Sequence, residues 1–532
     1  MKNLTVLLCL LYSINVAYAQ YKETTYTGTI KGYSINMGFR TAQVIINNIV
    51  TGKQEVYLIE IQSDGTYSAR FPLLRSQECL VTFPFFYTYV YFEPGKKLIQ
   101  DFDIADIPKV VSEFKGDRKL ALINNDINKV RPILSDYNYD VLYADIYQLT
   151  PEKYKAYIIK RMDRKLSKID SVANKEGIGK VGLELARRNI QYQTGYDLIT
   201  YNHMLDIAYR KKNKLSFASR KPALTPVRLS ADYYNFLKGM KYDQTAMASF
   251  NYNPFLNQLM YIDPIYEKIG RKDYTEAIKQ LKTLDTLDKD NKATIEYFES
   301  AAWINRSEPG ELEKARPIVL KELLNTDSSL GLDLMYLRSE SERMDAEKDT
   351  LSAAEFANIK STVKNKFLLA DVEELNEKIK ASIRSAKTQT GYTYNESPTN
   401  TPADSLFVQL MHKFKGKVVF IDFWATWCVP CMISIKEMAP LKEELAQNND
   451  IVFLYITNPS SPEKAYQTVM PGIQGEHYRL TNDQYNLLAK QFQVTGIPHY
   501  ALVNKRGNVV DGHFRWSQTD EIKKRLMALA NE

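Results

Sequence analysis

Cysteine and histidine are scarce in this chain, with four and five copies among 532 residues. So few cysteines exclude a fold that is held together by a framework of structural disulfides. A zinc site built on the close pair Cys428 and Cys431 needs two further ligands, usually a second cysteine pair or paired histidines. The histidines lack that spacing, because they stand at His203, His412, His477, His499 and His513. We therefore expect no metal, and the cysteine pair remains available for chemistry.

Net charge is small, and long apolar runs are missing. The chain has 70 basic and 63 acidic side chains, a formal charge of +7, and they form no basic cluster. This distribution predicts no nucleic-acid partner. After the N-terminus, no segment reaches the roughly 18 uninterrupted apolar residues of a membrane-spanning helix. At about 150 residues per domain, the length predicts three or four soluble domains.

Residues 1–19 have the pattern of a cleavable signal peptide. Lys2 supplies the positive start, residues 4–16 the apolar stretch, and Ala17-Tyr18-Ala19 the small-residue cleavage pattern before Gln20. An uncleaved membrane anchor is the competing interpretation. The pattern predicts export to the periplasm or cell envelope. Cleavage removes Cys9 and leaves one isolated cysteine, Cys79, beside the close pair.

Three regions that differ in their pattern of apolar and polar residues follow the signal peptide. Residues 20–112 are predicted to form an all-β, sandwich-like domain, with alternating runs at 25–31, 42–46, 56–61, 66–71, 79–83 and 87–92. Cys79 lies in one of these strands, and we expect it to be a buried core thiol. Residues 116–385 are predicted to be helical. One helix begins at Thr150-Pro151 and places Tyr154, Ile158, Met162, Leu166 and Ile169 on one face.

Residues 386–404 are polar and interrupted by two prolines, which is typical of a linker or of an extended lead-in strand. Residues 405–532 then alternate strands with helices, as expected of an α/β domain. The predicted architecture is therefore a multidomain chain with a β domain, a helical middle region and a C-terminal α/β domain.

The cysteine pair lies between a predicted strand and a predicted helix. Residues 418–423 are almost wholly apolar, as in a central strand covered on both faces, and Cys428 follows at the start of the helix. The unpaired amides and the dipole of a helix N-terminus stabilise a thiolate, which is the species that attacks disulfides. With two intervening residues, Cys431 can reach the resulting mixed disulfide and resolve it.

The segment FWATWCVPC at 423–431 closely resembles the active-site segment of the thioredoxin superfamily. About seventy residues later, TGIP at 495–498 resembles the segment that carries the cis-proline of this family. The long stretch 459–491 is similar to the helical insertion of the TlpA/ResA-like branch of exported thiol–disulfide oxidoreductases. The resemblance covers the C-terminal quarter, implies a thioredoxin fold there, and implies catalytic roles for Cys428, Cys431 and Pro498.

The same resemblance implies how protons are handled. Asp422 matches the buried acid that relays a proton to or from the resolving Cys431, and burial should raise its pKa. The lysine that usually partners this acid is missing from the strand at 451–457. Ser434 stands where the branch often has a glutamate, and we expect Glu437 to be a solvated charge on the helix surface.

Substrate contacts are implied at four further positions. Trp427 is expected to form a contact platform beside the cysteines, and Val429-Pro430 keeps the proline found in reducing members. The cis form of Pro498 would leave the Ile497 backbone free to pair with an incoming peptide. For His499, which follows, substrate contact and an ordinary place in a strand are equally open.

We therefore predict a periplasmic thiol–disulfide oxidoreductase, in the first place a protein disulfide reductase, that needs no cofactor. Its partners would be protein disulfide substrates and a membrane or periplasmic electron donor. Two alternatives remain open. One is a peroxiredoxin-like peroxidase, and the other is an envelope protein that binds a peptide or glycan and carries a subordinate redox module.

Overall fold

The computed structural model describes residues 21–105, 110–134, 146–216, 223–270, 310–326, 329–398, 405–494, 496–514 and 519–532. The expected signal peptide at 1–19 lies outside these residues. The chain divides into two compact units, residues 1–339 with 359–371 and residues 340–358 with 372–532. Each unit is described by itself below.

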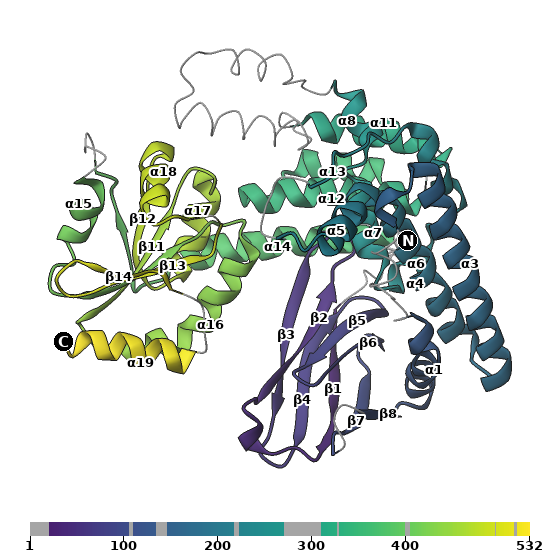
Figure 1. The fold of residues 1–532 in the computed structure, drawn as a ribbon, viewed down its shortest axis with the longest axis horizontal. Helices are drawn as coiled ribbons and strands as arrows, with labels where there is room; N and C mark the ends of the chain where they lie inside the picture. Colours follow the sequence, from purple (N-terminus) through teal and green to yellow (C-terminus); the bar gives the residue numbers. More distant parts are fainter. Residues whose placement is uncertain are drawn as a thin grey trace, which may run out of the picture. The chain divides into compact units, whose positions relative to one another are not determined.

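The first unit contains a single sheet of eight strands in the order β6-β5-β2-β3-β4-β1-β7-β8 (Figure 1). All neighbours are antiparallel except β1 and β7. Strands far apart in this order face one another, because Tyr26 of β1 contacts Phe92 of β6 with 5.4 Å between ring centroids. The strands are β1 Lys22–Lys31, β2 Thr41–Asn47, β3 Gln54–Ile61, β4 Thr66–Leu73, β5 Gln77–Phe83, β6 Phe86–Phe92, β7 Lys97–Asp103 and β8 Val111–Gly116.

The six predicted strands correspond to β1–β6, whereas the sequence patterns missed β7 and β8. In β7 the inward-facing side chains are Leu98, Gln100 and Phe102, so a polar residue interrupts the apolar alternation. Gln100 is buried because the Tyr26 hydroxyl donates a hydrogen bond to its Oε1 at 2.6 Å. The predicted boundary at 112 falls inside β8. Cys79 is a fully buried free thiol on β5, as predicted.

Most of the other residues that the structure describes in the first unit are helical. Thr150 caps α3, as predicted, because its side chain accepts a hydrogen bond from the Lys153 amide and Pro151 occupies the first turn. The helices are α1 Arg118–Leu134, α3 Pro151–Glu176, α4 Lys180–Ile199, α5 Tyr201–Lys212, α6 Gln244–Ala248, α7 Tyr252–Leu259, α8 Asp263–Lys268 and α11 Glu311–Leu324. Three more contribute to both units: α12 Leu330–Glu347, α13 Ala353–Thr362 and α14 Leu369–Ala386. Short 3-10 turns lie at Ile35–Met37, Ile146–Gln148, Ala231–Gly239 and Lys366–Leu368.

The second unit contains a six-stranded sheet in the order β14-β13-β10-β11-β12-β9. Strands β9, β12, β11 and β10 run parallel, and β13 and β14 are antiparallel to their neighbours. The strands are β9 Tyr392–Asn395, β10 Val418–Phe423, β11 Ile451–Thr457, β12 Gly475–Arg479, β13 His499–Val503 and β14 Val509–Phe514. The helices are α15 Leu406–His412, α16 Val429–Leu445, α17 Glu463–Val469, α18 Asn482–Gln491 and α19 Thr519–Ala530, with a 3-10 turn at Met470–Gly472.

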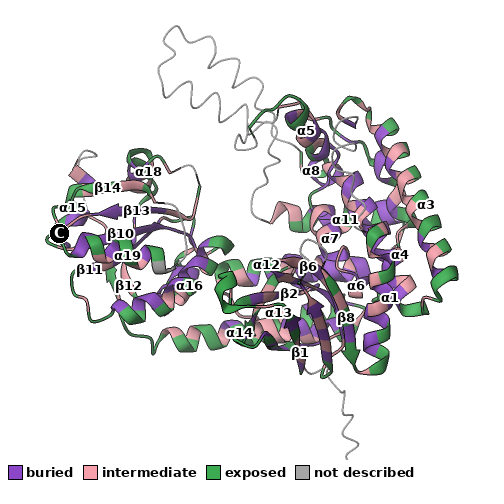
Figure 2. Cartoon of the chain, turned by 60° about the horizontal axis from the view of Figure 1, so that its bottom comes forward, coloured by how far each residue is buried: buried purple, intermediate pink, exposed green. Residues whose placement is uncertain are grey.

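Both faces of this sheet are covered, and Figure 2 shows β10 and β13 as largely buried. Residues of α16 and α19 form one core with one face, and residues of α15 and α18 form a second core with the other. Strand β9 lies inside the segment 386–404 that was predicted as a linker. Because β9 pairs with β12, residues 392–395 belong to the sheet, and the alternative of a lead-in strand describes them better.

Candidate functional site

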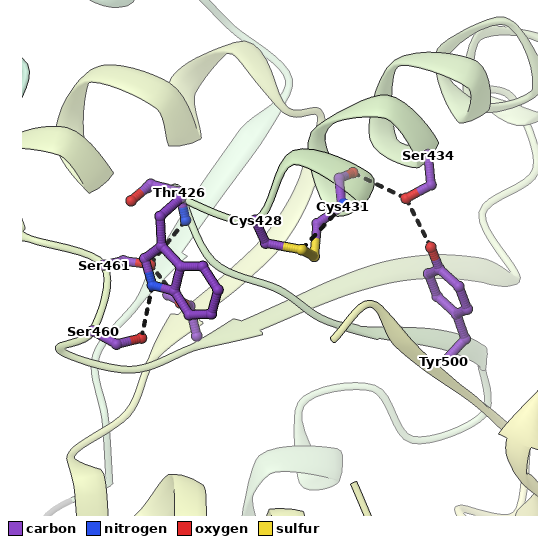
Figure 3. Close-up of a disulfide and its surroundings, with 9 residues drawn as sticks. Thr426, Cys428, Cys431, Ser434, Ser460, Ser461 and Tyr500 are labelled. Carbon is purple, nitrogen blue, oxygen red and sulfur yellow. Dashed lines mark hydrogen bonds between the residues drawn. A yellow bond between two sulfur atoms is a disulfide. The ribbon is translucent and has the colours of Figure 1, made fainter. Parts of the chain in front are cut away.

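The cysteine pair lies at the point where α16 begins, directly after the buried strand β10 (Figure 3). Cys428 and Cys431 form a disulfide, with their Cα atoms 5.2 Å apart. Cys428 is the N-cap residue of α16, and its Sγ accepts a hydrogen bond from the Cys431 amide at 3.2 Å. The sulfur therefore occupies the position where a helix N-terminus stabilises negative charge.

A neighbouring loop holds the segment that precedes the pair. The Thr426 amide donates to Ser461 Oγ at 3.1 Å, and Ser461 Oγ is 2.9 Å from Thr457 Oγ1 at the end of β11. The Trp427 indole N–H donates to Ser460 Oγ at 3.3 Å (Figure 3). These bonds fix the backbone before Cys428 and orient the indole ring.

Apolar side chains are exposed around the pair, whereas the sulfurs are not. Trp427 is 58% exposed and Val429 is 65% exposed, and Pro430 is also exposed. Cys428 is only 3% exposed, and Cys431 is fully buried. A partner can thus contact an apolar rim before it reaches the sulfur of Cys428.

The peptide bond between Ile497 and Pro498 is cis, as the resemblance implied. Ile497 is partly buried and packs against the core cluster that contains both cysteines. His499 is the first residue of β13, where its Nε2 lies 2.8 Å from the Gly512 carbonyl oxygen of β14. His499 is thus engaged within the sheet.

Asp422 is a buried acid on β10, with 3% of its surface exposed. It lies between Phe420 and Trp424 on one face of the strand, and both neighbours belong to the cluster that contains Cys428 and Cys431. Among the described residues, its Oδ1 is one of the few buried side-chain atoms without a hydrogen-bond partner. Burial raises the pKa of Asp422 to about 8, although the positive charge of Lys442 opposes the rise.

Sequence reasoning missed Lys442, the lysine that acts on Asp422. Strand β11 indeed lacks the lysine that usually partners this acid. Lys442 approaches instead from α16 and is only 6% exposed. Burial lowers its pKa to about 8, and Asp422 opposes that fall. A signal was present, because Lys442 continues the buried stripe Ile435, Met438, Leu445 at helical spacing. A lysine within an apolar stripe is rarely buried without a partner.

Ser434 and Tyr500 form a further hydrogen-bonded link to the pair. Tyr500 Oη donates to Ser434 Oγ at 2.7 Å, and Ser434 Oγ donates to the Cys431 carbonyl at 2.9 Å (Figure 3). Ser434 is buried, so a glutamate at this position would place a charge in the core. Glu437 is exposed, as predicted for a solvated helix charge.

The residues that the structure describes contain no group of three or more histidine, cysteine or acidic residues placed to hold a metal ion. Within the same residues, each helix is too short or too polar to cross a membrane.

Comparison with known proteins gives consistent matches to the second unit. Residues 398–523 match the family model described as Redoxin. Thioredoxin-like protein YneN of Bacillus subtilis is 28% identical over 116 residues, covering 21% of this chain and 65% of that protein. Thiol-disulfide oxidoreductase ResA of Halalkalibacterium halodurans is 24% identical over 119 residues, covering 22% and 65%. A Streptomyces coelicolor protein named as thioredoxin 2 is 31% identical over 110 residues, covering 20% and 72%. The chain thus spans just under two thirds of the first two relatives.

Proposed function

Because the chain belongs to the thioredoxin superfamily through its C-terminal domain, we propose that it is a thiol–disulfide oxidoreductase that reduces protein disulfides. The observation that carries this proposal is the position of Cys428 at the N-cap of α16. There its sulfur accepts the Cys431 amide hydrogen, so a thiolate formed on reduction has a donor already in place. The names of the relatives YneN and ResA support the same chemistry.

The reaction would proceed in two exchanges. The Cys428 thiolate attacks one sulfur of the substrate disulfide, forming a mixed disulfide and releasing the first substrate thiolate. Cys431 then loses its proton to the Asp422 carboxylate and attacks the Cys428 sulfur. The bond to the substrate breaks, the second substrate thiolate leaves and takes up a proton, and Cys428–Cys431 is oxidised as the substrate is reduced.

Substrate recognition is assigned to the rim of the pair. Trp427, Val429 and Pro430 offer exposed apolar surface beside a nearly buried sulfur. Such a rim suits an unfolded or extended peptide, because apolar contact gives affinity without reading a particular sequence. Pro498 and the backbone of Ile497 would position the substrate chain next to Cys428.

Turnover needs a supply of electrons, because each cycle leaves the pair oxidised. We assign this supply to a membrane or periplasmic dithiol donor, which would reduce the pair by the same exchange in reverse. The location follows from the signal-peptide pattern of residues 1–19. Mass spectrometry of the protein from envelope fractions tests it, because the mature chain should begin at Gln20.

Trapping tests the function directly. Cys431→Ser leaves Cys428 able to attack but removes the resolving thiol, so full-length protein should accumulate mixed disulfides with its substrates. Non-reducing gels of envelope extracts would show adducts that disappear on reduction, and mass spectrometry would place the link at Cys428.

The matched control is the double variant Cys428→Ser/Cys431→Ser, which keeps the buried thiol Cys79. It should form no adduct. If Cys431→Ser also forms none, or if the double variant forms as many, exchange through Cys428 is wrong. Peroxide consumption by the wild type in the absence of any disulfide substrate would instead favour a peroxidase.

A further inference from the structure

The ammonium group of Lys442 is held in a fixed position inside the second unit. Its Nζ donates hydrogen bonds to Tyr455 Oη at 3.0 Å and to the Gln474 carbonyl oxygen at 2.7 Å. It also lies over the Tyr455 ring, 4.9 Å from the centroid. The two hydrogen bonds fix a side chain that is otherwise flexible.

Tyr455, which holds the lysine, is the direct neighbour of Asp422 in the sheet. The register of β10 and β11 pairs Asp422 with Tyr455, so their side chains leave the same face of adjacent strands. The register thus places Tyr455 beside Asp422, and the positive charge of Lys442 lowers the pKa of this carboxyl against the effect of burial. Lys442 therefore acts on Asp422 from α16, across Tyr455.

Other titratable groups also face this pair. Tyr500 of β13 is the register partner of Asp422 on its other side, and Tyr485 of α18 also interacts with it electrostatically. Burial and the nearby acid raise the pKa of Tyr500, so it stays neutral at physiological pH. Lys442 is the one cation that acts on the Asp422 carboxyl among the described residues.

His477 adds a neighbour on the lysine side. Its ring stacks on Tyr455 at 5.0 Å, and its Nε2 lies 2.7 Å from the Ile473 carbonyl oxygen. Burial lowers the pKa of His477 to about 4, so it too is neutral at physiological pH. Tyr485, Tyr500 and His477 are thus neutral at physiological pH, and of the groups named here Asp422, Lys442 and the two cysteine thiols can carry charge.

An isolated carboxylate buried at Asp422 would be too costly to form, and a neutral acid cannot accept the Cys431 proton. We propose that Lys442, reaching across Tyr455, is the positioning residue that allows Asp422 to ionise and accept the Cys431 proton during resolution. This inference rests on the proposed function and deepens it. It assigns control of the resolving step to a residue of α16, the helix that Cys428 caps.

A purely structural role for Lys442 makes a different prediction. In that case its bond to the Gln474 carbonyl would only anchor the segment before β12. Replacing it would then lower stability without changing how the resolving step depends on pH. The pH profile therefore distinguishes the two roles.

The test uses the reduced full-length protein and glutathione disulfide. Quenched flow followed by mass spectrometry measures formation of the glutathione adduct on Cys428 and its decay by resolution, from about pH 6 to about pH 10. With Lys442→Met, we expect adduct formation to stay within about twofold of the wild type. The decay profile should move upward by about one pH unit or more, a slowing of about tenfold at neutral pH.

Two further variants serve as an independent perturbation and as a matched control. Tyr455→Phe removes only the hydroxyl that receives the lysine, and it should move the decay profile in the same direction by a smaller amount. Lys436→Met, on an exposed position of the same helix, should leave it unchanged. If the profiles of Lys442→Met and Tyr455→Phe both superimpose on that of the wild type, the inference is wrong. If the wild type forms no adduct on Cys428, or forms one that never resolves, the proposed function fails instead.

Discussion

Replacing Asp422 with asparagine should stabilise the second unit at neutral pH. In the folded chain burial raises the pKa of Asp422 to about 8, against an ordinary value of 3.8. Folding at pH 7 must therefore bind a proton that the unfolded chain has released. The interval from pH 3.8 to pH 7, at about 1.4 kcal/mol for each pH unit, corresponds to about 4 kcal/mol. Asparagine has nearly the same shape and carries no such cost.

The sign of this effect fixes its dependence on pH. Because the folded pKa is raised, Asp422 costs the wild type no stability below about pH 3.8, and this cost grows as the pH rises toward 8. The difference between variant and wild type should be near zero at about pH 4 and largest above about pH 8. Lys442 loses its partner in the variant, which makes the measured gain smaller than the full value.

Denaturant titration followed by tryptophan fluorescence measures this difference in the full-length oxidised protein. Trp424 and Trp427 lie beside the site and report unfolding of the second unit. Glu437→Gln is the matched control, because an exposed acid of α16 should change stability by about 0.5 kcal/mol or less. A gain of the same size at about pH 4 and pH 7, or no gain at all, would refute the reasoning.

Three predictions concern the first unit. Burial raises the pKa of Cys79, so iodoacetamide should modify it only after denaturant unfolds the chain, as mass spectrometry can show. Burial also raises the pKa of Glu78 to about 7, so the wild type should lose about 3 kcal/mol of stability between about pH 4.5 and pH 7. Glu78→Gln should abolish this pH dependence in urea titrations. The guanidinium of Arg338 is buried and donates to Ile49 O and to Asn253, so Arg338→Met should lower the free energy of unfolding by about 3 kcal/mol, with a lower thermal midpoint in calorimetry.

Local chemistry decided which elements could be predicted. Strands β1–β6 were found because their inward positions are apolar and recur every second residue. Strand β7 was missed because Gln100 occupies an inward position and is compensated by Tyr26, about seventy residues away. A hydrogen bond between distant residues leaves no periodic trace in the sequence. The start of α3 was found because Thr150 and Pro151 act on the helix they precede.

The same distinction applies within the site. Cys428, Cys431 and the strand before them are adjacent in sequence, so their chemistry was predictable from one segment. Asp422 was predictable as a buried acid because it is the charged residue of an apolar strand. Its electrostatic partner was not, because the choice of lysine depends on which side chain of α16 reaches over β11. That requires the register of two strands and the rotation of a helix, which one sequence does not specify.

The absence of a lysine from β11 and the presence of one in the apolar stripe of α16 are two parts of one arrangement. Tyr455 occupies the strand position beside Asp422, and its hydroxyl is the group that binds Lys442 Nζ. A buried cation on α16 would be costly alone, and a buried acid on β10 would stay protonated alone. Each therefore reduces the cost of burying the other. The cation that acts on the buried acid therefore comes from α16 in this chain, and not from the strand beside the acid.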